Sequence, residues 1–386
     1  MRVLHVVPSY LPAVRYGGPI YSVHALCRAL AVRGHDVHVF TTNVDGPGIS
    51  DVPLTEPVEM DGVKVRYFAC GLGRRLYRSP AMGHAIEAEV KAFQVLHLHS
   101  VFLWPTLAAA RAARKARVPY VVAPRGMLVG DLIERKSKVL KTLWIRLFER
   151  ANLAGAAAIH VTSELERAEL ENLGIPVRGV AVIANGIDVP ELTEASPESA
   201  ALPLPYILSL GRISWKKGLD RLIAAMSYVP DAVLLIAGND EENYQPQLEA
   251  MVRDLKLSAR VRFLGPVQDA KKWSLMRSAI IFAMPSYSEN FGIAALEAMA
   301  CGCPVVVTPE VGLASAIDCA GAGIAVSGEP AQLGAALAAL MSDSIRRVRM
   351  GTAGAKLAAE EYSWARIAQQ TERLYDRCLK EQAKSA

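Results

Sequence analysis

Two glutamates, Glu289 and Glu297, are the residues whose type and spacing most clearly suggest chemistry. Glu289 follows an apolar, strand-like run, and Glu297 lies in the helical pattern that begins at Gly292. Free backbone N–H groups at the start of that helix would meet an anion or a sugar hydroxyl. Eight helical steps would separate the two Cα atoms by about 12 Å, too far for the paired carboxylates of a retaining glycosidase. We therefore expect them to hold different hydroxyls of one extended ligand, rather than to be solvated surface charges.

A basic segment after another apolar run supplies a second set of polar groups. Residues 211–218 contain Arg212, Lys216 and Lys217. An arginine fork and a lysine ammonium suit the two phosphates of a diphosphate, and the start of the following helix adds positive charge. A solvated basic turn explains Lys216 well, but it explains Arg212 and Lys217 together less well. The segment therefore predicts a diphosphate site.

Short β-rich runs alternate with helical patterns along most of the chain, which is typical of α/β proteins with doubly wound parallel sheets. The strands are expected at residues 3–7, 37–41, 63–68, 95–99, 120–123, 158–161 and 180–183 in the first half, and at 206–210, 233–237, 261–264, 280–284 and 304–307 in the second. Such sheets bind ligands at the carboxyl ends of their strands, so two facing sheets would place the site in an interdomain cleft.

The alternation breaks once, at residues 188–205, which contain four prolines and three glutamates. This stiff polar stretch suits neither core and is expected to be a linker. The domains are then residues 1–187 and 206–362, followed by a terminal helical segment at 363–386.

Motifs for other chemistries are missing. The first strand-to-helix turn lacks Gly-x-Gly-x-x-Gly, and the sequence contains neither a P-loop nor Asp-x-Asp. His97 and His99 share one sheet face, but no carboxylate neighbour completes a metal-binding set, so a structural or cleft-lining role is expected. We therefore expect no metal and no bound cofactor.

Composition narrows the class of protein further. With 52% hydrophobic and 21% charged residues the chain should be globular, and a net charge of +5 is too diffuse to indicate a nucleic-acid partner. The six scattered cysteines favour reduced thiols, no apolar run reaches the roughly 18 residues of a membrane span, and no secretory signal precedes the first strand. We expect a cytoplasmic protein.

These motifs resemble those of glycosyltransferase family 4, the retaining, glycogen-synthase-like enzymes with the GT-B fold. Glu289 and Glu297 match the family's Glu-x7-Glu motif, and residues 211–218 are similar to its G-R-x4-K-G diphosphate clamp. The resemblance implies two facing Rossmann-like domains, a terminal helix that packs back on the first domain, and Arg212, Lys217 and Glu289 as catalytic residues.

The resemblance extends along nearly the whole chain and implies a set of donor-binding residues. Glu297 would hold the ribose, Glu289 would orient sugar hydroxyls, and Val267 would meet the nucleobase. Gly17 and Gly18 are similar to a glycine loop whose backbone approaches a phosphate, although a simple turn would need the same residues. The implied donor-binding set is Gly17, Gly18, Val267, Phe291, Gly292, Ile293 and Glu297.

One position departs from the family. Arg125 follows the strand that ends at Ala123, where many relatives have a histidine. Arginine cannot be deprotonated in proteins, so it could only bind an anion or stabilise leaving-group charge; pairing with nearby carbonyls or a carboxylate is the alternative. We expect Arg125 and His99 to lie on the acceptor side of the cleft.

A basic amphipathic pattern occupies residues 135–150. Its cations are Arg135, Lys136, Lys138, Lys141, Arg146 and Arg150, and its large apolar residues are Leu140, Leu143, Trp144, Leu147 and Phe148. Such a helix could rest on anionic lipid at the inner face of a membrane, and a core-packed helix with a solvated face would give the same pattern.

Together these features predict a retaining, metal-independent hexosyltransferase-type enzyme. It would move a sugar from a nucleoside-diphosphate sugar to a hydroxyl of a sugar or lipid-linked acceptor, in polysaccharide or glycolipid assembly. A GT-B-fold sugar-nucleotide epimerase or hydrolase and a non-catalytic sugar-nucleotide sensor remain as alternatives. The sequence does not specify the base, the sugar or the acceptor.

Overall fold

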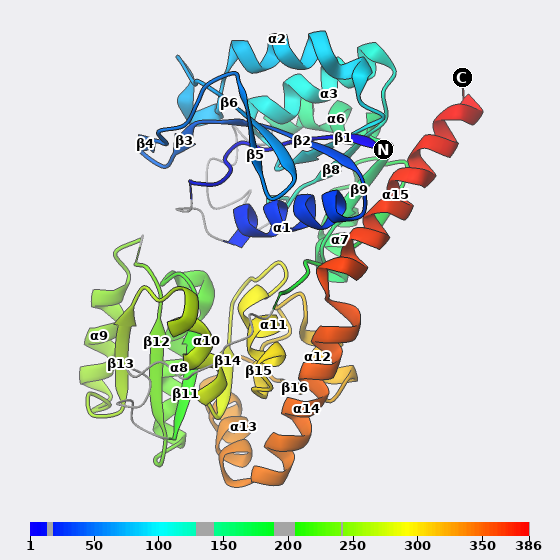
Figure 1. Ribbon diagram of the computed structural model, residues 1–386. Helices are drawn as coiled ribbons and strands as arrows, with labels where there is room; N and C mark the ends of the chain where they lie inside the picture. Colours follow the sequence, from blue (N-terminus) through cyan, green and yellow to red (C-terminus); the bar gives the residue numbers. More distant parts are fainter. Residues whose placement is uncertain (14–17, 129–142, 189–204, 241, 386) are drawn as a thin grey trace. The chain divides into compact units, whose positions relative to one another are not determined.

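The protein divides into two compact units (Figure 1). Unit 1 comprises Met1–Gly186 and Trp364–Ala386, and unit 2 comprises Ile187–Ser363. Most of the linker expected at 188–205 lies outside the described residues. This computed structural model describes residues 1–13, 18–128, 143–188, 205–240 and 242–385.

Unit 1 is built on an eight-stranded sheet with the order β10-β9-β8-β7-β1-β2-β6-β5. All neighbouring strands are parallel except β5, which pairs antiparallel with β6 at one edge. A separate antiparallel pair, β3 and β4, lies outside this sheet. The strands are β1 Arg2–Val6, β2 Asp36–Thr42, β3 Val44–Asp45, β4 Gly48–Ile49, β5 Pro57–Met60, β6 Val63–Phe68, β7 Val95–His99, β8 Tyr120–Ala123, β9 Ala158–Val161 and β10 Val180–Val182.

Alternate residues of the central strands pack into two hydrophobic cores, one on each face of the sheet. Leu4 and Val6 of β1 pack in one core, while Val3 packs in the other with Tyr375 of the terminal helix α15. Helix α15 belongs to unit 1 and runs beside α1 (Figure 1). The described helices of unit 1 are α1 Gly18–Val32, α2 Pro80–Glu89, α3 Trp104–Ala116, α6 Arg150–Gly155, α7 Glu164–Asn172 and α15 Trp364–Ser385, with the short 3-10 turns η1 Arg74–Leu76 and η2 Val90–Ala92 and the π-helical turn η3 Ile145–Glu149.

Unit 2 contains a six-stranded parallel sheet with the order β13-β12-β11-β14-β15-β16. Its strands are β11 Tyr206–Leu210, β12 Val233–Ala237, β13 Val261–Gly265, β14 Ile281–Met284, β15 Val305–Val307 and β16 Gly323–Ala325. Its helices are α8 Leu219–Ala225, α9 Gln245–Asp254, α10 Asp269–Ser278, α11 Ile293–Ala300, α12 Ala314–Cys319, α13 Pro330–Ser342 and α14 Ser344–Glu361, with short turns η5 Trp215–Lys217 and η6 Met226–Tyr228.

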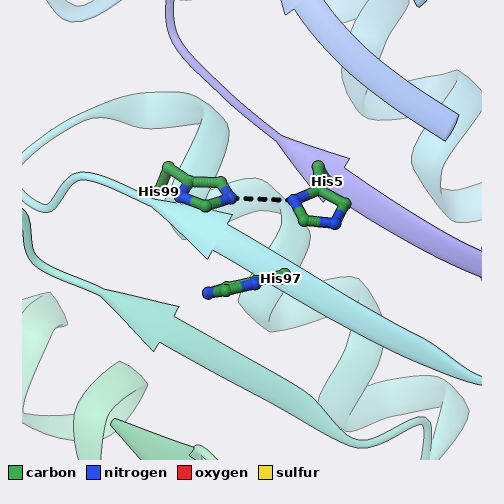
Figure 2. Close-up of side chains that lie close together, drawn as sticks. All are labelled: His5, His97 and His99. Atoms are coloured by element: carbon green, nitrogen blue, oxygen red, sulfur yellow. Dashed lines mark hydrogen bonds between the residues drawn. The ribbon is translucent and has the colours of Figure 1, made fainter. Parts of the chain in front are cut away.

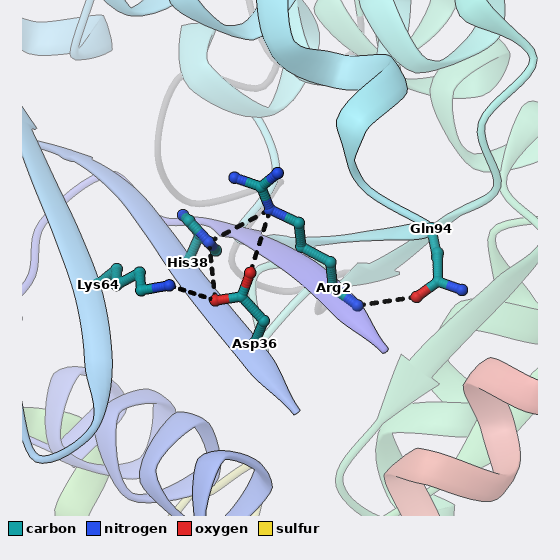
Figure 3. Close-up of polar contacts among 5 residues, drawn as sticks. All are labelled: Arg2, Asp36, His38, Lys64 and Gln94. Atoms are coloured by element: carbon teal, nitrogen blue, oxygen red, sulfur yellow. Dashed lines mark hydrogen bonds and ion pairs between the residues drawn. The ribbon is translucent and has the colours of Figure 1, made fainter. Parts of the chain in front are cut away.

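The amino-terminal edge of the unit 1 sheet is held by a polar network around Asp36 (Figure 3). The Asp36 carboxylate accepts a hydrogen bond from Nζ of Lys64 at 2.8 Å. It also pairs with Nε of Arg2 at 3.2 Å and with Nε2 of His38 at 3.0 Å. The backbone N–H of Arg2 donates to Oε1 of Gln94 at 2.8 Å. Ligands of doubly wound sheets bind at the opposite, carboxyl edge. This network therefore fixes strand starts and is not part of the candidate site.

Candidate active site

The basic segment of unit 2 forms a tight loop between β11 and α8. Lys217 ends the short turn η5, and Gly218 follows with φ +61°, in the left-handed region. A Cβ at Gly218 would collide with the backbone carbonyl of Pro285, so glycine lets this loop approach the loop after β14. Ser209, Arg212 and Lys217 are among the residues that line a pocket at this point.

The two sequence motifs of unit 2 meet in the structure. Glu289 lies in the loop after β14, and its carboxylate forms an ion pair with Nζ of Lys217. The loops are also joined through the backbone, because the N–H of Tyr287 donates to the carbonyl of Lys216 at 2.7 Å. Glu289 itself is fixed by an isolated bridge to Val311. The arrangement brings a cationic loop and a carboxylate to the edge of the sheet where β11 and β14 end.

Glu297 lies one turn into α11 and has a cationic partner that the sequence did not indicate. Nζ of Lys272, on α10, lies 2.8 Å from Oε1 of Glu297. The ammonium of Lys272 also lies 4.3 Å from the ring centre of Trp273. The two partners are 25 residues apart, and only the packing of α10 against α11 brings them together. No motif spacing could have found Lys272.

The remaining donor-side residues of unit 2 surround the start of α11 or follow β13. Gly292 has φ +101° and precedes Ile293, the first residue of the helix. Phe291 is buried, and its ring meets that of Tyr362 edge-on at 6.1 Å. Val267 follows β13 and is half-buried. Glycine is needed at the turn because a Cβ on Gly292 would press on the side chain of Val311.

In unit 1, Arg125 follows β8 with φ +57°. Its Nη1 donates to Oδ1 of Asn185 at 2.8 Å, and its Nη2 lies 3.3 Å from Nδ1 of His99. His99 is 1% exposed. Its side chain is therefore buried and does not have the cleft-lining position that we expected for it. Gly18 is the first residue of α1, and Gly17 lies outside the described residues.

A third histidine, rather than a carboxylate, joins His97 and His99. His5 of β1 lies opposite His97 in the parallel register, and its Nδ1 lies 2.9 Å from Nε2 of His99 (Figure 2). One ring nitrogen from each of the three histidines lies within 4.8 Å of the other two. Alternating polar residues in two neighbouring strands were the only signal that could have predicted this cluster.

Comparison with known proteins shows which family this chain belongs to. A model described as "Glycosyl transferase 4-like domain" matches residues 17–186, and one described as "Glycosyl transferases group 1" matches residues 193–357. A phosphatidyl-myo-inositol mannosyltransferase of Mycobacterium leprae is 31% identical over 384 residues, which cover 93% of each chain. The chain belongs to glycosyltransferase family 4. This membership confirms the predicted activity, sugar transfer, and lends no support to the epimerase or the sensor.

Solved structures confirm the predicted GT-B fold of this glycosyltransferase. A sucrose-phosphate synthase of Thermosynechococcus elongatus superposes with a TM-score of 0.78 at 22% identity and covers 98% of this chain and 99% of its own. Anabaena HepE in complex with UDP-glucose superposes with a TM-score of 0.73 at 19% identity over the full length of both chains. At these identities the likeness shows the fold: two Rossmann-like α/β units with parallel sheets.

The basic amphipathic segment of the glycosyltransferase is described only from residue 143 onward, so most of its cations lie outside the described residues. The described part has two different faces. Leu143 and Leu147 are 52% and 57% exposed, and Arg146 and Arg150 are exposed beside them. Trp144 instead packs against the core of unit 1. Among the described residues, no helix is both long enough and apolar enough to span a bilayer.

Proposed function

We propose that this glycosyltransferase moves a hexosyl group from a nucleoside-diphosphate sugar to an acceptor hydroxyl, with retention of configuration and without a metal ion. The observation that supports this most directly is the ion pair between Lys217 and Glu289, which joins the cationic loop to the Glu-x7-Glu motif at one edge of the unit 2 sheet. The complex of HepE with UDP-glucose, a protein of the same fold, supports the class of donor.

In the proposed reaction the bond between the anomeric carbon and the diphosphate breaks, and the acceptor oxygen bonds to that carbon on the same face. The departing phosphate oxygen takes the proton of the acceptor hydroxyl. Arg212 and Lys217 stabilise the negative charge that develops on the diphosphate, which is an electrostatic form of catalysis. Lys217 has three N–H donors, so it can keep Glu289 while it binds a phosphate oxygen.

The carboxylates would have different tasks. Glu289, fixed by Lys217, would orient hydroxyls of the transferred sugar, and Glu297, fixed by Lys272, would hold the ribose. Both ion pairs leave one carboxylate oxygen available to a ligand hydroxyl. The other residues proposed to contact the donor are Gly17, Gly18, Val267, Phe291, Gly292 and Ile293.

We also propose a sugar or lipid-linked acceptor and peripheral contact with an anionic membrane at its cytoplasmic face, in glycolipid or polysaccharide assembly. The exposed leucines Leu143 and Leu147, with Arg146 and Arg150 beside them, combine apolar area with positive charge as interfacial segments do. The relative named phosphatidyl-myo-inositol mannosyltransferase supports a lipid acceptor.

A ligand screen followed by product analysis tests the proposed reaction. Nucleoside diphosphates should raise the melting temperature of unit 2, since a ligand at 100 times its Kd adds about 2.7 kcal/mol to the free energy of unfolding. The Arg212→Ala/Lys217→Ala double variant, the matched control, should lose this shift. NMR of the product should show the anomeric configuration of the donor sugar. An inverted product, or an equal shift in the double variant, would contradict the proposal.

A further inference from the structure

Four buried histidines of unit 1 lie on one face of the sheet, beneath the terminal helix α15. They are His5 on β1, His97 and His99 on β7, and His160 on β9, each at most 2% exposed. The hydroxyl of Tyr375, delivered by α15, lies 2.8 Å from Nδ1 of His97 and 3.5 Å from Nε2 of His5. None of these groups has a part in the proposed transfer.

Hydrogen bonds join these side chains into one continuous chain, which we call the histidine relay. It is anchored at one end by the carbonyl of Ile183, 2.8 Å from Nε2 of His160, and at the other by the guanidinium of Arg125. The links between are His160 Nδ1 to His97 Nε2 at 3.2 Å, His97 to Tyr375, Tyr375 to His5, and His5 Nδ1 to His99 Nε2 at 2.9 Å.

The donor and the acceptor of each hydrogen bond in the relay can be assigned by starting from the carbonyl of Ile183. A carbonyl can only accept, so Nε2 of His160 must be protonated. In a neutral ring Nδ1 of His160 then accepts from Nε2 of His97, and Nδ1 of His97 accepts the hydroxyl hydrogen of Tyr375. Tyr375 has no second hydrogen to give, so it accepts from the next member of the relay.

The same direction continues to Arg125. Nε2 of His5 donates to Tyr375, so Nδ1 of His5 accepts from Nε2 of His99, and Nδ1 of His99 is left as an acceptor. A guanidinium can only donate, so Arg125 requires the same tautomer of His99. Both ends of the relay therefore demand one arrangement, in which every ring is neutral.

The surroundings agree with neutral rings. Burial, with a smaller contribution from the charge of Arg125, lowers the pKa of His5 and of His160 to about 3. Burial, again with a contribution from Arg125, takes the pKa of His99 well below its ordinary value. The rings stay uncharged in the folded protein at neutral pH.

This arrangement does not pair the guanidinium of Arg125 with a carboxylate of any described residue. Its hydrogen bonds to described residues go to two neutral acceptors, Asn185 and His99, and it forms no ion pair with a described carboxylate. Glu166 acts on Arg125 through space, but its two oxygens accept N–H groups of Gly126, at 2.6 Å, and Thr162, at 2.7 Å. Each terminal nitrogen of Arg125 keeps a second N–H for a ligand.

We propose that Arg125 binds a phosphate group of a substrate, and that the histidine relay, completed by Tyr375 of α15, holds its guanidinium in place without neutralising it. A guanidinium fixed by neutral acceptors matches a phosphate in charge and in donor geometry. His99, Asn185 and Tyr375 are then positioning residues. This proposal rests on the proposed function in one respect: it takes the phosphate to be part of a substrate of the transfer reaction.

A metal ion at His5, His97 and His99 is the competing interpretation of the cluster. It fits poorly, because a cation there would have to replace the 2.9 Å bond between His5 and His99. It would also lie close to the positive charge of Arg125, which contacts His99. Each of the three rings already has hydrogen-bond partners, because His5 bonds to His99, His99 to Arg125, and His97 to Tyr375 and His160. These bonds indicate a hydrogen-bonded chain rather than a metal-binding set.

The test measures binding of inorganic phosphate by ³¹P NMR titration in the Arg212→Ala/Lys217→Ala background, which removes the proposed clamp of unit 2. Phosphate should still bind, and Arg125→Gln should abolish that binding. Asn185→Asp keeps the acceptor of Arg125 but adds a negative charge. It should weaken phosphate binding by about tenfold or more without lowering the melting temperature, because its charge cancels that of the guanidinium.

Tyr375→Phe tests the relay itself. Without the hydroxyl, the tautomers of His5 and His99 are no longer fixed from the Ile183 end of the relay. His99 then holds Arg125 less firmly, so phosphate binding should weaken by about fivefold. Tyr120→Phe is the matched control, because it also removes a buried hydroxyl of unit 1, one that donates to the carbonyl of Asn152, and it should bind like the background.

Any of three phosphate-binding results would overturn the proposal: no phosphate binding in the background variant, unchanged affinity in Asn185→Asp, or equal affinities in Tyr375→Phe and Tyr120→Phe. If Asn185→Asp does not fold, the tyrosine pair decides. Retention of one zinc ion per chain after dialysis would also overturn it, because the metal would occupy the ring nitrogens of the relay. Failure of the donor clamp would instead appear in the screen of nucleoside diphosphates, so the two proposals can fail separately.

Discussion

Lys217 and Glu289 form an ion pair across 72 residues of sequence, and their side chains are 22% and 20% exposed. The pair is therefore partly shielded from water, and each member fixes the position of the other. Removing Glu289 would release Lys217 as well as delete a carboxylate. The role of the cationic loop is best tested through its own residues.

Arg212→Ala and Lys217→Ala should each lower kcat by about 10²-fold or more, because each removes a positive charge from the departing diphosphate. Lys216→Ala is the matched control in the same loop, and it should retain near-wild-type turnover. Initial rates at saturating donor measure the effect. Near-wild-type turnover in both the Arg212 and the Lys217 variant would disprove the diphosphate clamp.

Lys272→Met should raise the KM for the donor several-fold and leave kcat nearly unchanged. A rise in KM of this size corresponds to the loss of about one charge-assisted hydrogen bond. The reason is that Lys272 fixes Glu297, which is proposed to hold the ribose, a part of the donor remote from the reacting carbon. Glu297→Gln should act in the same direction. A fall in kcat with unchanged KM would place Glu297 at the reaction centre instead.

The sequence predicted much of the fold because its strongest signals are local. Strands β6, β7, β8, β9, β11 and β12 have the predicted bounds, since apolar runs mark them clearly. Two strands gave no comparable run of apolar residues. Strand β5 lies at the edge of its sheet with alternate residues exposed, and β16 has only three residues.

The pairings within the sites could not be predicted in the same way. Lys217 with Glu289, Lys272 with Glu297, and His5 with His99 are each set by which elements are neighbours in a sheet or a helix layer. Strand order is a property of the whole fold, and no local spacing encodes it. Motifs therefore predicted residues of the candidate site, but not the residues that form ion pairs or hydrogen bonds with them.

Removal of divalent ions should leave transfer activity unchanged. The proposed clamp already supplies positive charge to the diphosphate through Arg212 and Lys217, so no metal is required for that task. Rates before and after dialysis against EDTA measure this, with magnesium or manganese added back as the control. Activity that disappears with EDTA and returns with the ion would show that the donor needs a metal.

Leu143→Gln/Leu147→Gln should weaken co-sedimentation with vesicles that contain anionic lipid by about tenfold, since both exposed side chains would lose apolar burial at the interface. Val32→Gln, at another exposed apolar residue of unit 1, should bind vesicles like the wild type. Equal binding of the double variant and the wild type would mean that the two leucines do not face a membrane.

Unit 1 should lose stability as the pH falls from 7 to 5. Burial lowers the folded-state pKa of His5 and His160 from 6.5 to about 3, so the unfolded chain binds more protons between these values. The free energy of unfolding is therefore full above pH 6.5 and declines below it, by at most about 1.4 kcal/mol per pH unit for each histidine. Hydrogen exchange of β1, β7 and β9 amides as a function of pH measures the slope.

His160→Gln separates this titration from that of the carboxylates. A glutamine amide can still donate to the carbonyl of Ile183, but it takes up no proton on unfolding, so the variant should show a shallower pH slope than the wild type even if it is less stable at pH 7. His84→Gln, at an exposed histidine of α2, is the control and should leave the slope unchanged. A His160→Gln slope as steep as that of the wild type would mean that buried neutral histidines do not account for the acid sensitivity of unit 1.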